Sequence, residues 1–386
     1  MNLRQIIPYG KQDILEEDIN EVVRVLRSDF LTQGPMVPKF EHMLCEYTGA
    51  EHAVVVNSCT SALHIACLAL NLGPGDILWT SPISFVASAN CGLYCGASVD
   101  FVDVNPDTAL MSVTALEFKL EQAELQGRLP KIVIPVHFAG QSCDMKAISK
   151  LGEKYNFRII EDAAHAVGAS YLNRNVGSCQ YSDVTVFSFH PVKIITTGEG
   201  GVALTNNLDV AKKMKRLRSH GITRDPEEMV NPKGQDWYYE QISLGFNYRM
   251  SDIQAALGIS QLSRLDGYVN KRSEIANWYD NQFKNILVNP LIQEKYGRPS
   301  HHLYVIRVNN REGERDRLYR YLRKNDICVN VHYIPIYRQP FFNKKMRLLG
   351  AEEYYKLGLS LPIFPTISKN DLKKVTQKIS EFYEYY

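Results

Sequence analysis

The sequence predicts an α/β protein whose main sheet is largely parallel, followed by a smaller α+β unit. Short apolar runs alternate with helical patterns from about residue 13 to about 220, as in successive βαβ units. The apolar runs are rich in β-branched residues and do not alternate with polar ones, so both faces of each strand should be buried. A chain of 386 residues is long enough for two domains, which we place at residues 1–262 and 263–386.

The elements of the first unit follow in a regular order. Segment 13–29 has apolar residues at the spacing of an amphipathic helix. A buried-strand run at 52–58 leads into a helix that stops at Gly73-Pro74-Gly75. The later elements expected here are strands at 76–82, 99–104, 131–140 and 157–162, with a helix at about 84–95 and helical stretches between the later strands.

After residue 181 the order changes. Strands at 181–191 and 200–206 follow each other with no helix between them, so one antiparallel pair is expected. Residues 222–243 are polar and aromatic and should form a loop or excursion. The rest of the chain is expected to hold helices at about 250–285, a strand at 301–308, a helix at 311–326, a strand at 327–335 and helices to the C-terminus.

The composition is that of a soluble globular protein, with 45% hydrophobic and 22% charged residues and a net charge of +2. No block of Lys and Arg stands out, so nucleic acid is not an expected partner. The eight cysteines form no C-x-x-C pair, which favours reduced thiols over a zinc site or disulfides. No signal peptide or membrane span is apparent. We expect a cytoplasmic protein with no membrane partner and no metal.

Three segments carry polar residues where chemistry is expected. In the first, NSCTSAL at 57–63, a strand ends and a helix begins. Ser58, Thr60 and Ser61 can cap that helix, and the free N–H groups of a helix start also attract phosphate. Capping and phosphate binding are both open at this point. Neither a P-loop nor a G-x-G-x-x-G fingerprint is present, which disfavours nucleotide binding of those kinds.

The second segment is IIEDAAHAVGA at 159–169, where two carboxylates end a hydrophobic strand. The ligands of α/β sheets bind at that end of the strands. Because side chains alternate along a strand, Glu161 and Asp162 should point to opposite faces, so only one can enter a given pocket. A buried aspartate needs a cationic partner, although a carboxylate that only caps the next helix is an equally simple explanation.

The third segment is VFSFHPVKIITTGEGG at 186–201, where Lys193 follows a buried strand. Partial burial would lower the pKa of its ammonium group and make it a candidate nucleophile for a carbonyl, whereas an exposed loop lysine is the alternative. Together, a phosphate cradle, an aspartate and a nucleophilic lysine match what pyridoxal phosphate requires. The aspartate keeps the pyridine nitrogen protonated, and the lysine holds the aldehyde as a Schiff base.

These motifs resemble those of the DegT/StrS family of pyridoxal-phosphate sugar aminotransferases, which have the aspartate aminotransferase-type fold (fold type I). The resemblance covers nearly the whole chain, and within the family the chain is most similar to enzymes that aminate carbon 4 of UDP-linked 4-keto-6-deoxy-N-acetylhexosamines in pseudaminic acid biosynthesis. TSPISFVASAN and VNVHYIPIY carry that finer similarity. The family motifs are LTQGPMVPKFE, NSCTSALHIA, EDAAHAVGA, SFHPVKIITTGEGG, RSHG and GFNYRMSDIQAALGISQL.

The resemblance implies roles for the matching residues on the cofactor side. Lys193 carries the aldehyde, Asp162 pairs with the ring nitrogen, and Phe85 stacks on the ring. His165 stands near the ring hydroxyl, where many members have glutamine. The implied phosphate ligands are Thr60, Ser61 and Ser188, together with Asn247 of the neighbouring subunit, which implies a homodimer with shared active sites.

The substrate side also follows from the resemblance. Arg249 and His332 could face the diphosphate, and the aromatic residues 237–239 could line a sugar or uracil pocket or only pack the excursion. The positions that match substrate contacts of the more similar relatives are Tyr9, Asp29, Phe30, Leu31, Thr32, Ser58, Asn330, Val331, His332 and Tyr333.

The implied reaction moves an amino group from L-glutamate to the ketone of a UDP-sugar, with Lys193 acting as general base and then general acid. Some relatives carry histidine at this position and remove a sugar hydroxyl instead. Lys193 argues against that branch, and His190 is part of the motif rather than a substitute. A family member acting on another nucleotide ketosugar, and a non-catalytic sugar-binding or regulatory member, are the alternatives; a plain dehydrogenase would lack its glycine fingerprint here.

Overall fold

The protein is built around a seven-stranded sheet with the strand order β1-β9-β8-β5-β4-β2-β3. The computed structural model describes residues 6–385 apart from 232–233, 285, 287, 310 and 343–344. β9 runs antiparallel to its neighbours β1 and β8, and the other pairs are parallel. The expected parallel sheet and the antiparallel pair near residue 200 are therefore confirmed. The strands are β1 (His52–Val56), β2 (Ile77–Thr80), β3 (Ser98–Phe101), β4 (Ile132–Ile134), β5 (Arg158–Asp162), β8 (Val184–Ser188) and β9 (Gly201–Thr205).

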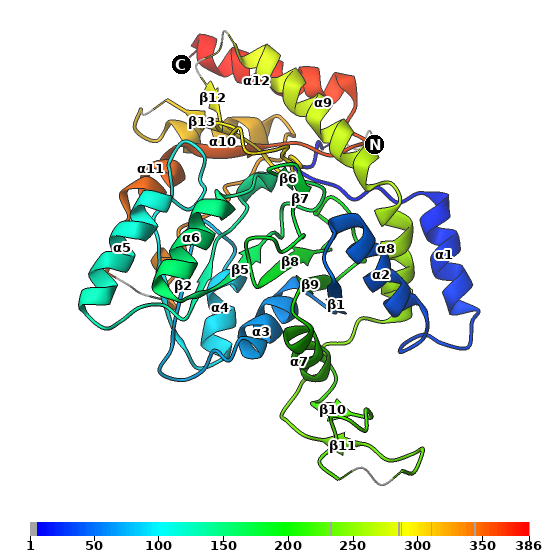
Figure 1. The fold of residues 1–386 in the computed structure, drawn as a ribbon. Helices are drawn as coiled ribbons and strands as arrows, with labels where there is room; N and C mark the ends of the chain where they lie inside the picture. The colour runs from blue at the N-terminus through cyan, green and yellow to red at the C-terminus, as the bar shows by residue number, and fades with distance from the viewer. Residues whose placement is uncertain are drawn as a thin grey trace.

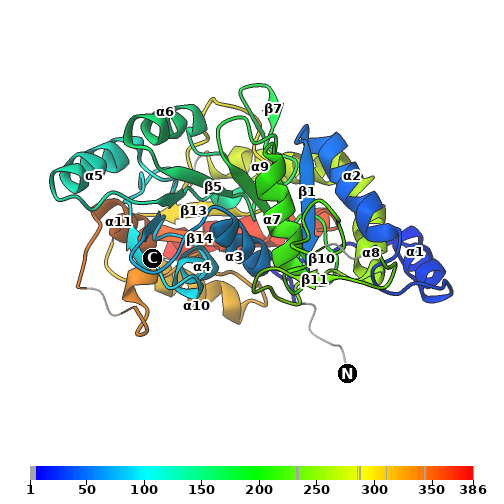
Figure 2. The same ribbon diagram turned by 60° about the horizontal axis from the view of Figure 1, so that its bottom comes forward.

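Helices cover both faces of this sheet (Figure 1). α5 and α6 lie on one side of it, and α3 and α4 lie on the other (Figure 2). Every residue of β4, β8 and β9 is buried, which explains why their sequences are continuous apolar runs. The helices of this part are α1 (Glu16–Leu26), α2 (Met36–Thr48), α3 (Cys59–Ala69), α4 (Ala87–Tyr94), α5 (Val113–Leu125), α6 (Met145–Tyr155), α7 (Leu208–Arg218) and α8 (Asp252–Leu262).

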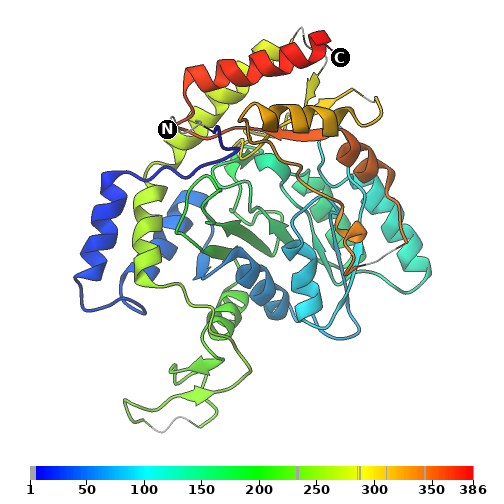
Figure 3. The same cartoon turned by 180° about the vertical axis from the view of Figure 1, so that it is seen from behind.

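Two small hairpins leave the main sheet. β6 (Ser170–Tyr171) pairs with β7 (Arg174–Asn175), and β10 (Ile222–Thr223) pairs with β11 (Glu240–Gln241). The β10–β11 hairpin projects away from the body of the molecule (Figures 1 and 3). The excursion that the polar sequence of residues 222–243 predicts is therefore confirmed.

A smaller unit follows, with a three-stranded sheet in the order β12-β13-β14. Its core cluster includes Ile306, Leu318 and Val375, and the N-terminal residue Ile7 joins it. The division of the chain at 262/263 stays a prediction. The elements of this unit are α9 (Leu265–Phe283), β12 (Val288–Pro290), β13 (Tyr304–Val308), α10 (Glu314–Lys324), α11 (Leu349–Leu357), β14 (Gly358–Leu361) and α12 (Lys369–Tyr385).

The expected strand at 327–335 is wrong. This segment makes only isolated bridges, from Ile327 to Ile7 and from Asn330 to Ser360. Beyond Asn330 the chain turns so that residues 330–334 line a cavity, and it then enters a short 3-10 turn at Ile336–Arg338. The third strand is instead β14, in a stretch where only helices were expected. Among the described helices, none combines the length and the apolarity that crossing a bilayer would need.

Candidate active site

A cavity of about 680 Å³ opens beyond the carboxyl ends of the parallel strands. Residues that follow β1, β2, β5 and β8 line it, together with the 330–334 segment. Ligands of open α/β sheets bind in this position, and the volume is in the range of small-molecule sites. The predicted site residues that line the cavity are Tyr9, Ser58, Thr60, Phe85, Asp162, His165, Ser188, Lys193, Asn330, Val331, His332 and Tyr333.

Several other predicted residues do not line this cavity. The Ser61 side chain lies behind the start of α3, where its hydroxyl donates to Oδ1 of Asn57 at 2.7 Å. Asn247 and residues 29–32 are exposed on the surface of the chain, so their proposed roles stay predictions. Arg249 and the aromatic residues 237–239 also lie outside the lining set.

The start of α3 forms one wall of the cavity. Ser58 is its N-cap, and its Oγ accepts a hydrogen bond from the main-chain N–H of Ser61 at 3.1 Å. A Cβ at Gly201 would lie 2.6 Å from the nitrogen of Cys59, so glycine is required for β9 to approach this helix start. Thr60 and Ser188 also line the cavity, and hydroxyl side chains beside a helix start suit a phosphate.

Lys193 lies in the turn that follows β8, where its N–H donates to the carbonyl of His190 at 2.8 Å. Burial lowers the pKa of its ammonium group to about 8, although the charge of Asp162 and the thiol of Cys59 act in the opposite direction. A lysine with this pKa is partly neutral near physiological pH, so its amine can attack a carbonyl.

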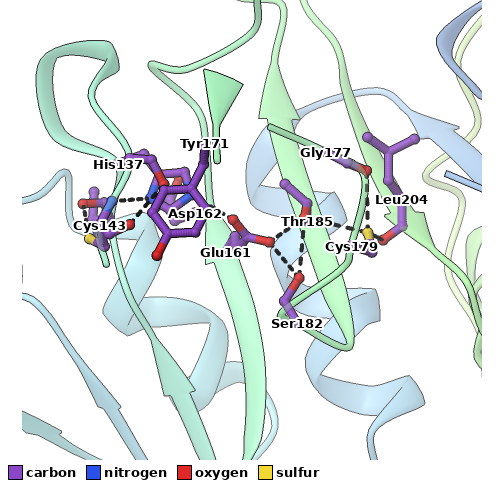
Figure 4. Close-up of polar contacts among 12 residues, drawn as sticks. His137, Cys143, Glu161, Asp162, Tyr171, Gly177, Cys179, Ser182, Thr185 and Leu204 are labelled. Carbon is purple, nitrogen blue, oxygen red and sulfur yellow. Dashed lines mark hydrogen bonds and ion pairs between the residues drawn. The ribbon is translucent and has the colours of Figure 1, made fainter. Parts of the chain in front are cut away.

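Asp162 and Glu161 leave the end of β5 toward opposite faces, as expected. The carboxylate of Asp162 lines the cavity, where Oδ2 accepts from the hydroxyl of Ser88 at 2.6 Å and Oδ1 accepts from the N–H of Ala164 at 3.1 Å. Glu161 points the other way, and its oxygens lie 2.6 Å from Nε2 of His137 and 2.9 Å from the hydroxyl of Thr185 (Figure 4).

The environment of Glu161 explains how a second carboxylate can be buried here. Burial alone would raise the pKa of its carboxyl group, but the hydrogen bonds and the attraction of His137 outweigh burial and hold that pKa below its ordinary value. Burial alone would lower the pKa of the His137 imidazole, but its hydrogen bonds with Cys143 and Glu161 and the charge of Glu161 raise that pKa to about 10, so Nε2 of a charged His137 donates to Glu161. The pair is therefore part of the scaffold behind the cavity.

His165 is neutral in this site. Burial, and then the nearby charges of Lys193 and His332, hold the pKa of its imidazole well below the ordinary value. Nδ1 accepts a hydrogen bond from the N–H of Ala139 at 3.3 Å. A main-chain N–H can only donate, so the ring proton is on Nε2, which lies 3.1 Å from the hydroxyl of Tyr333.

Several lining residues are not among the predicted site residues. His302 packs its ring against that of His165, with centroids 4.4 Å apart, and it comes from a segment that carries no motif. His190 and Glu199 lie within the lysine motif, with side-chain atoms 3.9 Å apart near the cavity. The remaining residues of this kind with polar side chains are Cys59, Ser84 and Gln339.

A lysine of lowered pKa, a carboxylate and a helix start that share one cavity of this fold are typical of aminotransferases of the aspartate aminotransferase type. Among the described residues, no group of three or more His, Cys, Asp or Glu side chains could hold a metal. Comparison with known proteins gives the finer assignment. Residues 12–380 match the model of the DegT/DnrJ/EryC1/StrS aminotransferase family, and the chain belongs to that family.

Individual relatives agree with this assignment. The chain is 38% identical over 390 residues to the UDP-4-amino-4,6-dideoxy-N-acetyl-beta-L-altrosamine transaminase of Campylobacter jejuni, covering 98% of each chain. Its structure resembles that of Helicobacter pylori PseC, an aminotransferase of pseudoaminic acid biosynthesis, with a TM-score of 0.91, 33% identity and coverage of 99% and 100%. The PLP form of a putative sugar aminotransferase, Spr1654 from Streptococcus pneumoniae, matches with a TM-score of 0.87, 29% identity and 99% coverage of both chains. The predicted fold class and the prediction of a sugar aminotransferase are confirmed.

Proposed function

We propose that this protein is a pyridoxal-phosphate aminotransferase that moves an amino group from L-glutamate to carbon 4 of a UDP-linked 4-keto-6-deoxy-N-acetylhexosamine. The product would be of the UDP-4-amino-4,6-dideoxy-N-acetyl-beta-L-altrosamine type. The single observation that carries the proposal is that Lys193, with its lowered pKa, shares one cavity with the carboxylate of Asp162 and the start of α3. The name of the Campylobacter relative supports the substrate class, and that of the Helicobacter protein supports a role in pseudoaminic acid biosynthesis.

The residues present fit the proposed cofactor in size and in chemistry. The cavity is large enough, and Ser58, Cys59 and Thr60 at the start of α3 line it, where a helix N-terminus favours a phosphate. When bound, the cofactor supplies an aldehyde for amine exchange and a ring that accepts electrons. In this site Lys193 would hold the aldehyde, Asp162 the ring nitrogen, and Phe85, which is 60% exposed, one face of the ring.

The side chains of this protein would then handle the protons of the reaction. The amine of Lys193, once released, would take a proton from the donor carbon and then give it up again, as general base and then general acid. Tyr9, His332 and Tyr333 would orient the sugar from the side of the smaller unit, because they line the same cavity. The apolar part of the lining, which includes Leu63 and Val136, would help to exclude water once the ligands are bound.

We also propose an oligomeric state and a cellular location for the enzyme. Asn247 and residues 29–32 are exposed outside the cavity of their own chain, which supports a homodimer in which each chain completes the site of the other. We further propose a cytoplasmic location, where nucleotide sugars and glutamate are available.

The test is incubation of the purified protein with pyridoxal phosphate, L-glutamate and a panel of nucleotide 4-ketosugars. Mass spectrometry of the products and NMR of the new amine carbon identify the substrate and the stereochemistry. We expect visible absorbance in the resting protein, its loss on addition of glutamate, and an aminated UDP-sugar. Amination of a different nucleotide sugar would transfer the assignment to another substrate within the family.

The matched control is Lys193→Ala, which should fold, bind the cofactor weakly and give no product. A wild-type protein that binds UDP-sugars but shows neither absorbance nor product would instead be a non-catalytic member of the family. Retained turnover in Lys193→Ala would refute the role of this lysine.

A further inference from the structure

The carboxylate of Asp162 is hydrogen-bonded to a chain of two serine hydroxyls, which have no role in the proposed reaction. Oγ of Ser88 lies 2.6 Å from Oδ2 of Asp162, and Oγ of Ser84 lies 2.7 Å from Oγ of Ser88. Ser88 is fully buried in the first turn of α4, and Ser84 lines the cavity. All three groups are therefore removed from bulk water, where a hydrogen bond of this kind is strongest.

The direction of the chain follows from counting protons. A carboxylate can only accept, and 2.6 Å is typical of a hydroxyl that donates to a charged oxygen. The carbonyl of Phe85 also lies near Oγ of Ser88, at 3.3 Å, but the much shorter contact assigns the one proton of Ser88 to Asp162. Ser88 cannot also donate to Ser84. The hydroxyl of Ser84 must therefore donate to Ser88, which gives the order Ser84 to Ser88 to Asp162.

This arrangement fixes the plane of the carboxylate. Oδ1 accepts from the N–H of Ala164 at 3.1 Å while Oδ2 accepts from Ser88, so the group is held at both oxygens and cannot turn about its last bond. A carboxylate has about four lone-pair positions. One donor on each oxygen leaves acceptor positions for a charged N–H in the cavity, in a direction set by the two partners.

We propose that Ser88 is a positioning residue that aims the carboxylate of Asp162 at the ring nitrogen of the bound cofactor, with Ser84 fixing the orientation of Ser88. This inference rests on the proposed function. Phe85 lies between the two serines in the sequence and lines the same cavity. One short segment after β2 would therefore supply both the residue that stacks on the cofactor ring and the residue that orients the partner of its nitrogen.

The test compares Ser88→Ala, which removes the hydroxyl, with Ser88→Thr, which keeps it. The first readout is the ¹⁵N NMR signal of the ring nitrogen in protein loaded with ¹⁵N-labelled pyridoxal phosphate, followed over pH. In the wild type the nitrogen should stay protonated. In Ser88→Ala it should lose its proton at a lower pH, and kcat should fall roughly 10- to 100-fold, as expected for loss of a hydrogen bond to a charged group. Ser88→Thr should keep both the protonated nitrogen and a kcat near that of the wild type.

Two further variants separate positioning from damage to the helix. Cys91→Ala removes one side-chain atom from the same helix, at another fully buried position outside the cavity lining. It also removes the contact of the Cys91 thiol with the main-chain carbonyl of Ser88 at 3.4 Å but keeps the Ser88 hydroxyl, so it should leave the nitrogen signal unchanged. When Ser88→Ala is added to Asp162→Asn, kcat should fall little further, because the effects of coupled residues are not additive.

The outcomes distinguish this inference from the proposed function. A wild-type protein with no signal from bound cofactor would contradict the proposed function. A loaded, active wild type whose Ser88→Ala variant keeps the same nitrogen signal and a kcat within about twofold would overturn the role of Ser88 alone. Equal changes in Cys91→Ala and Ser88→Ala would also overturn it, because the effect would then come from packing of the helix.

Discussion

The hydroxyl of Tyr333 lies 3.1 Å from Nε2 of His165, across the junction between the main sheet and the 330–334 segment. Because Ala139 occupies Nδ1 as a donor, His165 donates through Nε2 to the oxygen of Tyr333. The proton of Tyr333 is then free to be donated to a ligand in the cavity. Burial raises the pKa of the Tyr333 hydroxyl, so that proton is retained.

We predict that His165 stays in the neutral, Nε2-protonated form between about pH 5 and 8, where a histidine ordinarily titrates. The reason is that burial and the charge of Lys193 hold its pKa well below the usual value. The ring ¹⁵N shifts of the protein report this directly. In Tyr333→Phe the Nε2 signal should move while the Nδ1 signal stays, and turnover should fall about 10-fold through loss of one hydrogen bond. A proton found on Nδ1 would contradict the assignment.

The lowered pKa of Lys193 predicts how the stability of the cofactor-free protein depends on pH. Its folded-state pKa of about 8 lies below the ordinary value of 10.5, so between these values the unfolded chain binds a proton that the folded chain does not. Stability therefore rises with pH across this window. Below pH 8 the ammonium, on a half-buried side chain, costs at most about 3–4 kcal/mol, and less where water enters the cavity.

Lys193→Met should remove that penalty. At pH 7 the cofactor-free variant should be more stable than the wild type, and the difference should shrink as the pH rises from about 8 toward 10.5. Urea unfolding at several pH values measures it. Lys39→Met, at an exposed position, serves as the control and should show no such trend. A difference that is constant with pH would mean that the pKa of Lys193 is the same in the folded and the unfolded chain, and would contradict the lowered value.

Asp162→Asn removes the negative charge from the cavity while keeping the shape of the side chain. We expect the ring nitrogen of the proposed cofactor to lose most of its protonation, because an amide cannot balance its positive charge, and turnover should fall at least about 100-fold. The absorption spectrum and single-turnover rates with glutamate are the measurements. Near-normal rates would count against the role of Asp162. Glu161→Gln makes the same chemical change one residue earlier, on the opposite face, and should leave the spectrum intact.

Local patterns were enough to predict the parts of this site that lie at strand ends. The β-branched run before Glu161 and Asp162 indicates a buried strand, and alternation along it separates the two carboxylates without further information. The start of α3 and the position of Lys193 follow from similar local signals. These residues converge because the carboxyl ends of parallel strands meet at one edge of the sheet.

The parts that could not be predicted depend on contacts between distant segments. His302 enters the site only because the small unit packs against the main sheet, and nothing in its own sequence indicates a ligand. Residues 327–335 have the apolar pattern of a strand, but they form only isolated bridges, because the chain turns toward the cavity after Asn330. β14, with the sequence GLSL, is short and weakly patterned, so its place beside β13 is set by tertiary packing rather than by propensity.

The buried pair behind the site gives the last prediction. Glu161 is held by His137, Thr185 and Ser182 (Figure 4), and its lowered pKa means that it stabilises the fold while ionised. Glu161→Gln should therefore cost about 3–5 kcal/mol of unfolding free energy at pH 7, the usual effect of breaking a buried pair from one side. Because a depressed carboxyl pKa contributes stability that is lost as the pH falls, the difference from wild type should shrink below about pH 4.5. Urea unfolding at pH 7 and in acid checks both points, and a variant within 1 kcal/mol of wild type at pH 7, on the order of one ordinary hydrogen bond, would show that the pair contributes little.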